Sequence, residues 1–204
     1  MAKLKPADEK TEQKTGAGRR TPVIMMALIA VTTALVFLST FIFQVPIPAT
    51  QGYFNLGDIM IFITALTFGP EVGGFSGGVG SALSDVISPG GPPFAPFTLI
   101  IKGSEGLVAG LISRRVFRGR DLASWISGSA IMVAGYFLAE WYFIALVFGA
   151  SDFTGFVAAS AELPFNVLQV VAGGGIGIPV SIVLRRALRE TPLSFSLPKT
   201  NSAK

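Results

Sequence analysis

The sequence predicts an all-α membrane protein with six transmembrane helices and both termini in the cytoplasm. Three observations indicate this class. Half of the 204 residues are hydrophobic and only 14% are charged, whereas soluble domains carry about 25% charged residues; the mean hydropathy is +0.62. The apolar residues form segments of roughly 20 residues, the length that a helix needs to cross a bilayer. All but one of the 16 basic residues lie outside these segments.

The N-terminal part contains a polar tail and two apolar segments. Residues 1–21 are mixed in charge and show no apolar period, so we expect a disordered cytoplasmic tail. The apolar run after the tail is too long for a cleaved signal peptide. We expect the first helix over about 22–43, where Pro22 suits a first turn. The second is expected over about 55–68, which is short for a bilayer of about 30 Å.

Four more helices are expected in the rest of the chain. The glycine-rich third covers about 71–88, and the loop PGGPPFAP separates it from the fourth, about 97–113. The fifth covers about 122–148. The sixth covers about 156–184, and Pro164 is expected to kink or split it. Residues 22–186 would then form one transmembrane domain, followed by a cytoplasmic tail over 187–204.

The basic residues orient these helices in the plasma membrane. Six spans put the N-terminal tail, the 114–121 loop with its four arginines and the C-terminal segment on the same side. This side is therefore predicted to be cytoplasmic. A miscount by one span would scatter these charges over both faces.

Several function classes are excluded by composition and motifs. The chain has no Cys and no His, which excludes disulfides, thiolate or histidine metal sites and a Ser-His-Asp triad. The segment GGFSGGVGS lacks the Gly-Lys-Ser/Thr ending of a phosphate loop, and its small-xxx-small pairs favour close helix packing. The pI near 9.6 does not indicate nucleic-acid binding, because the positive charge lies at span boundaries. We expect no enzyme activity, metal or cofactor.

Lys102 is the basic residue that lies inside an apolar run, FTLIIKGSEGLVAGLI. A buried ammonium is costly unless it is paired, so Lys102 is a candidate for a functional site. Glu105 lies three residues away, and Glu140 lies at a similar depth, roughly 10–14 Å below the outer surface. We expect Lys102 to pair with one of them in a polar pocket that opens outward. The alternative is a purely structural ion pair.

Other polar residues share helix faces near the outer ends of the spans. Asn55 and Asp58 are three residues apart, and Glu162, Asn166 and Gln169 follow an i, i+4, i+7 spacing. Aromatic side chains would stack on a ring-containing ligand. The candidate substrate-binding residues are Tyr53, Asn55, Asp58, Asp85, Lys102, Glu105, Glu140, Trp141, Asn166 and Gln169. For the amides, hydrogen bonding between helices is an equal alternative, and Asp85 and Glu162 could simply reach interfacial water. A phosphorylated ligand would need several cations around it, and Lys102 is the single one available, so a phosphate ester is not favoured as the ligand.

Ala30 and Ala34 form an Ala-xxx-Ala groove on the first helix. Such a groove either admits a partner helix or serves internal packing.

The segments FNLGDIMIFITALTFGPEVGGFSGGVGSALSD and APFTLIIKGSEGLVAGLI, together with this groove, resemble the membrane S components of energy-coupling-factor (ECF) vitamin transporters, riboflavin-type branch. The resemblance covers about residues 22–186, and its most specific parts are residues 55–58 and 101–106. It implies high-affinity capture of riboflavin or a similar small heteroaromatic vitamin from outside. It also implies docking through Ala30 and Ala34 on a transmembrane T component with two cytoplasmic ATPases. ATP would be used by those subunits, and this chain would hold the vitamin as substrate.

The competing hypothesis is a standalone ion-coupled transporter that uses Glu105, Glu140 and Lys102 as a relay. The two halves of the chain do not mirror each other, which weakens an inverted-repeat transporter.

Overall fold

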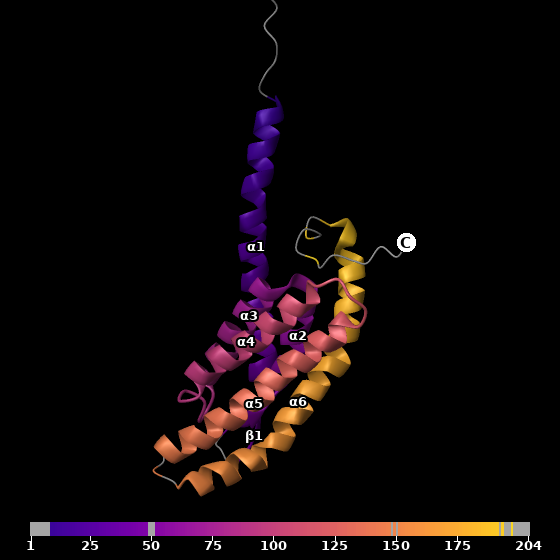
Figure 1. Ribbon diagram of the computed structural model, residues 1–204. Helices are drawn as coiled ribbons and strands as arrows, with labels where there is room; N and C mark the ends of the chain where they lie inside the picture. Colours follow the sequence, from indigo (N-terminus) through magenta and orange to yellow (C-terminus); the bar gives the residue numbers. More distant parts are fainter. Residues whose placement is uncertain are drawn as a thin grey trace, which may run out of the picture.

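The computed structural model describes residues 9–48, 52–147, 149, 151–191, 193 and 197. These parts are a bundle of α-helices with one small sheet (Figure 1). The helices are α1 (Glu9–Ile42), α2 (Gly57–Phe68), α3 (Pro70–Ile87), α4 (Ala95–Ser113), α5 (Arg120–Val147) and α6 (Asp152–Ala187). The strands β1 (Val45–Pro46) and β2 (Tyr53–Phe54) pair antiparallel, and the 3-10 turn η1 (Leu188–Glu190) follows α6. The order of six helices that the sequence predicts is therefore confirmed.

Three elements differ from expectation. α1 begins at Glu9 rather than near Pro22, so residues 9–21 are helical instead of disordered; they include the helix formers Glu, Lys and Gln. Residues 1–8 lie outside the described part. The expected loop between α1 and α2 contains β1 and β2. α6 continues through Pro164 and Pro179 as one helix, so the expected split at Pro164 is wrong, while the alternative of a kink there stays a prediction.

Four helices are long and apolar enough to cross a membrane, over Pro22–Ile42, Ala95–Ser113, Arg120–Tyr142 and Asp152–Glu190. α2 has only 12 residues, and α3 has 18 that include five glycines. Nearly all side chains of α2 are buried, because α2 packs against α1, α3, α4 and α6. The short α2 is thus shielded by protein rather than exposed to lipid over its length. The expected count of six spans stays a prediction.

Glycines let α3 and α4 pack closely. A Cβ atom on Gly78 would lie 2.7 Å from the Leu99 carbonyl oxygen, and one on Gly77 would lie 2.8 Å from the Lys102 carbonyl oxygen. Either contact is shorter than real Cβ atoms show, so these two positions require glycine. The interpretation of the small-xxx-small pairs as packing residues is confirmed here.

Ion pairs hold the helices together at the end of the bundle where the last turns of α6 lie. Arg185 donates to the Asp121 carboxylate at 2.5 Å and to the Leu66 carbonyl oxygen at 3.0 Å. Arg114 donates to the Glu71 carboxylate at 2.7 Å. These contacts bring the α2–α3 turn, the α4–α5 loop and the end of α6 together, and α1 begins on the same side (Figure 1). The sheet and the α5–α6 connection lie at the opposite end.

Candidate binding site

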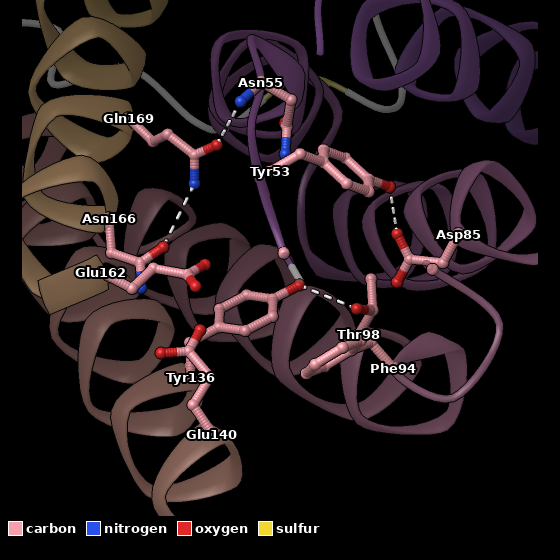
Figure 2. A pocket seen from close by; sticks show the side chains of 12 residues that line it. Tyr53, Asn55, Asp85, Phe94, Thr98, Tyr136, Glu140, Glu162, Asn166 and Gln169 are labelled. Atoms are coloured by element: carbon pink, nitrogen blue, oxygen red, sulfur yellow. Dashed lines mark hydrogen bonds between the residues drawn. The ribbon is translucent and has the colours of Figure 1, made fainter. Parts of the chain in front are cut away.

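A cavity lies at the end of the bundle that carries the sheet. About 410 Å³ of empty space lies between its walls, a figure that includes the open mouth. The sheet, the α3–α4 connection and four helices supply its walls (Figure 2). The lining residues are Gly52, Tyr53, Asn55, Asp85, Gly91, Phe94, Thr98, Tyr136, Glu140, Glu162, Asn166 and Gln169.

The first wall comes from β2 and the end of α3. The Tyr53 hydroxyl donates to the Asp85 carboxylate. Burial raises the pKa of Tyr53, and the negative charge of Asp85 raises it further, so the phenol stays protonated and acts as a donor. Just after α1, the Gln44 amide donates to the hydroxyls of Ser84 at 3.2 Å and Ser88 at 2.7 Å. These bonds attach the α1–α2 connection to the end of α3.

The opposite wall is one face of α6. The Asn55 backbone N–H donates to Gln169 Oε1 at 2.5 Å, and Gln169 Nε2 donates to Asn166 Oδ1 at 3.4 Å. Asn55 Oδ1 accepts from the Gly57 N–H at 2.8 Å, a local turn that leads the chain into α2. Glu162, Asn166 and Gln169 all line the cavity, as their predicted spacing on one helix face requires.

The third wall comes from α4 and α5. The hydroxyls of Thr98 and Tyr136 are hydrogen-bonded at 2.9 Å (Figure 2). The sequence interpretation missed both residues. Thr98 lies four residues before Lys102, and Tyr136 lies four residues before Glu140, so helical spacing places each on the same face as a predicted residue. That spacing was the available signal.

Several polar atoms at the cavity are buried without a hydrogen-bond partner among the described residues. They are Glu140 Oε2, Asp85 Oδ2 and Asn166 Nδ2, and the three side chains are at most 5% exposed. Buried polar atoms in proteins are normally hydrogen-bonded. Unpaired atoms that line a cavity are therefore available to a polar ligand.

Lys102 lies outside the cavity lining. Its ammonium donates to the Asp58 carboxylate and is 3.5 Å from Glu105 Oε2, and all three side chains are buried. The ammonium also lies over the ring of Tyr136, 5.4 Å from its centroid. The predicted pairing with Glu105 is confirmed, and Asp58 is a second partner that the sequence did not indicate. Glu140 is not a partner, because Tyr136, one turn earlier on α5, takes the place beside Lys102; Glu140 interacts with Glu162 instead.

The candidate residues therefore divide into two sets. Those that line the cavity are Tyr53, Asn55, Asp85, Glu140, Asn166 and Gln169. Those that do not are Asp58, Lys102, Glu105 and Trp141. Trp141 donates its indole N–H to the Asp152 carbonyl oxygen at 3.1 Å and stacks on Tyr142, with ring centroids 5.3 Å apart. It belongs to an aromatic cluster between α5 and α6, and its predicted stacking role in the pocket does not fit this position.

Ala30 and Ala34 lie on an exposed face of α1. The buried face of α1 carries Thr32, Val36 and Thr40, and Thr32 is hydrogen-bonded to Ser76 of α3 at 2.6 Å. Internal packing therefore does not explain the small residues, and docking of a partner helix stays a prediction.

Comparison with known proteins places this geometry in context. The family model described as "ECF-type riboflavin transporter, S component" matches residues 21–186. A Pyrococcus woesei protein described as uncharacterised is 42% identical over 154 residues, which are 75% of this chain and 96% of that protein. The thiamine precursor transporter HmpT of Lactococcus lactis is 28% identical over 162 residues, 79% of this chain and 87% of that protein. A solved structure of the S component of a bacterial ECF transporter has the same fold, with a TM-score of 0.60 and 21% identity over 80% of this chain and 95% of that chain.

Proposed function

Because the chain belongs to the family of S components of ECF-type riboflavin transporters, we propose that it captures riboflavin or a similar small heteroaromatic vitamin in the cavity. Members of this family are membrane-embedded, substrate-binding subunits of transporters and not enzymes. The chain is thus a multi-pass protein of the plasma membrane that binds a vitamin-type substrate.

The observation that carries the proposal is the agreement between family match and cavity. The match over 21–186 includes every residue that lines the cavity, from Gly52 to Gln169. The rings of Tyr53, Phe94 and Tyr136 stand among polar groups in this lining, which suits a nitrogen-containing aromatic ligand. The family description supports riboflavin, and the name of the Lactococcus lactis relative supports a thiamine precursor.

The proposal includes partner subunits. Family membership implies an ECF module with a T component and ATPases, and the lack of a phosphate loop in this sequence leaves ATP hydrolysis to them. The exposed face of α1 with Ala30 and Ala34 is the proposed docking surface. We further propose that the cavity opens to the outside, because the opposite end of the bundle carries the arginines of the α4–α5 loop and of α6.

Native mass spectrometry tests the function directly. The full chain, purified from cells grown with vitamins, is expected to carry a bound vitamin and to bind riboflavin or a thiamine precursor again after washing. Purified chain that carries and binds neither would contradict the proposal.

A transport assay distinguishes the competing hypothesis. Cells that produce this chain with T component and ATPases are expected to take up the vitamin, and cells that produce the chain without ATPases are not. Uptake by the chain alone that an ionophore abolishes would instead favour a secondary transporter.

A further inference from the structure

We propose that the buried cluster of Lys102, Asp58 and Glu105 binds one proton, which Glu105 carries, and that this proton is a resident part of the folded protein. None of the three residues lines the cavity, so the proton site is independent of which ligand the cavity holds.

The cluster contains one cationic group and two carboxyl groups. The Lys102 ammonium donates to the Asp58 carboxylate, and its nitrogen lies 3.5 Å from Glu105 Oε2. Lys102 and Asp58 neutralise each other, so an ionised Glu105 would leave the cluster with a net negative charge. All three side chains are at most 2% exposed, and an uncompensated charge is costly where water does not solvate it. A proton on Glu105 makes the cluster neutral.

The unpaired oxygen atoms of the cluster indicate the same ligand. Glu105 Oε1 and Oε2 and Asp58 Oδ2 are buried without a hydrogen-bond partner among the described residues, whereas buried polar atoms are normally hydrogen-bonded. Two ionised carboxylates offer only acceptors to each other, but a protonated carboxyl group has an O–H donor. Asp58 and Glu105 lie beside the same ammonium nitrogen, so the added donor has a carboxylate acceptor in its neighbourhood.

No second basic side chain is available inside the bundle to neutralise Glu105. In the sequence, Lys102 is the only basic residue between Pro22 and Ser113, and residues 122–184 contain none. α3 and α6 approach the cluster with glycines, Gly77 beside the Lys102 carbonyl oxygen and Gly173 beside the Asp58 side chain. α5 presents the ring of Tyr136 to Lys102. The titratable groups that these three helices add at the cavity beyond it are acidic: Asp85, Glu140 and Glu162.

Protein closes the cluster on both sides. Toward the cavity, the ring of Tyr136 lies over the ammonium, 5.4 Å from nitrogen to centroid, and the same side chain lines the cavity (Figure 2). Toward the opposite end, Phe62 and Ala109 follow the two acidic residues by one helical turn, and both belong to the buried apolar core. We therefore expect the proton to exchange slowly with bulk water, which does not suit the relay of an ion-coupled transporter.

Infrared spectroscopy of the full chain tests for the proton directly. A protonated carboxyl group has a C=O stretching band that a carboxylate lacks. The chain is measured at neutral pH in a detergent without carbonyl groups, and the spectrum of Glu105→Gln is subtracted from that of the unmodified chain. The difference is expected to contain the band of a single carboxylic acid, because bands of other carboxyl groups cancel. The band is expected to keep its position for hours in D2O, since the site is closed.

A second variant separates the proton site from a purely structural role of Glu105. In Asp58→Asn, Glu105 becomes the remaining carboxyl group beside Lys102 and is expected to give up its proton to pair with the ammonium. The Glu105 band should then disappear although Glu105 is present. Glu71→Gln is the matched control, because Glu71 lies in an exposed ion pair with Arg114, and it is expected to leave the band unchanged.

Thermal unfolding checks the same charge balance. Glu105→Gln and Asp58→Asn each leave Lys102 with one carboxylate, so each is expected to unfold within about 3 °C of the unmodified chain. The two changes together leave the ammonium buried without a carboxylate. This double variant is expected to unfold at least about 6 °C lower.

Several outcomes would overturn the proposal. One is the absence of a carboxylic acid band that Glu105→Gln removes, and another is a band that persists in Asp58→Asn. A band that shifts at once in D2O would show that the proton is not resident. Failure of Glu105→Gln to fold would also count against it, because Gln reproduces the size and neutrality of the protonated acid. Stabilisation of the unmodified chain, but not of Glu105→Gln, by sodium ions at constant pH would show that the missing cation is sodium rather than a proton.

Discussion

Lys102 shows at the scale of single residues how a buried charge is tolerated in this protein. Its ammonium neutralises Asp58 and lies near Glu105, all three at most 2% exposed. Lys102→Met keeps the length of the side chain but leaves two buried carboxyl groups without their cation. Removing one partner of a buried ion pair costs about 3–5 kcal/mol. We expect the variant to unfold at lower temperature in a thermal denaturation assay in detergent.

Second-site changes make this prediction specific. Asp58→Asn in the Lys102→Met background is expected to restore stability, because it removes the carboxylate that Lys102 contacts directly. Glu140→Gln in the same background is the control and is not expected to restore it, because Glu140 interacts with Glu162 rather than with Lys102. A stable Lys102→Met variant that no longer binds ligand would instead place Lys102 in the binding site.

The residue-level predictions from sequence succeed where one helix decides the outcome. The positions of Glu162, Asn166 and Gln169 along one cavity wall follow from the helical period alone. The choice between Asp58, Glu105 and Glu140 as partners of Lys102 depends on how α2, α4 and α5 cross, and the period of one helix does not contain that information. Threonine and tyrosine are common in ordinary helix packing, so residue type alone did not identify Thr98 and Tyr136 as candidate binding residues.

At the scale of elements, α3 and α4 pack so closely that there is little space for an added side-chain atom between them. A Cβ atom on Gly78 would lie 2.7 Å from the Leu99 carbonyl oxygen, whereas the atoms nearest to a Cβ on Gly103 would be 3.5 Å away. Gly78→Ala is therefore expected to destabilise the protein by about 1–3 kcal/mol through overpacking. Gly103→Ala is the matched control and is expected to be neutral or to stabilise by up to about 1 kcal/mol, since Ala favours helix. Thermal unfolding of both variants checks this; equal loss in both would contradict the close approach at Gly78.

α1 offers a test at the same scale, because its small residues face away from the bundle. Ala30→Trp combined with Ala34→Trp fills the groove with two large rings, so a partner helix could no longer approach closely. We expect the double variant to lose co-purification with the T component and ATPases while ligand binding is retained. Leu168→Trp on the exposed face of α6 is the control and should assemble normally. Normal assembly of the double variant would remove α1 as the docking surface.

The elements that the sequence predicts best are those with local end signals. Gly69 separates α2 from α3, which begins at Pro70, and the loop after α3 is rich in proline and glycine. The start of α1 that the sequence predicts, near Pro22, is wrong. Pro22 suits a first turn of a helix, but it lies inside this helix in the structure. β1 and β2 were missed because the pairing of Val45 with Phe54 joins two-residue strands that show no pattern of their own.

At the scale of the whole molecule, the charges divide the bundle into two ends. The exposed ion pair of Arg114 with Glu71 and the partly buried pair of Arg185 with Asp121 lie at one end. The carboxyl groups of the cavity lie at the other. The order of six helices is predictable from apolar segments, but the number of spans is not. Neither α2 nor α3 is among the four helices that are long and apolar enough to cross a membrane, and the short α2 depends on its neighbours for cover.

This division of charge predicts the orientation in the membrane. If the arginine-bearing end faces the cytoplasm, and if α2 and α3 both cross, a fluorescent protein fused after Lys204 is expected to fluoresce and alkaline phosphatase at the same site to be inactive. Phosphatase inserted after Gly149, in the α5–α6 connection, is expected to be active, because this connection lies at the cavity end. Active phosphatase after Lys204 together with inactive phosphatase after Gly149 would invert the protein and place the cavity on the cytoplasmic side, where it could not capture a ligand from outside. Activity at both sites would mean that α6 does not cross the membrane.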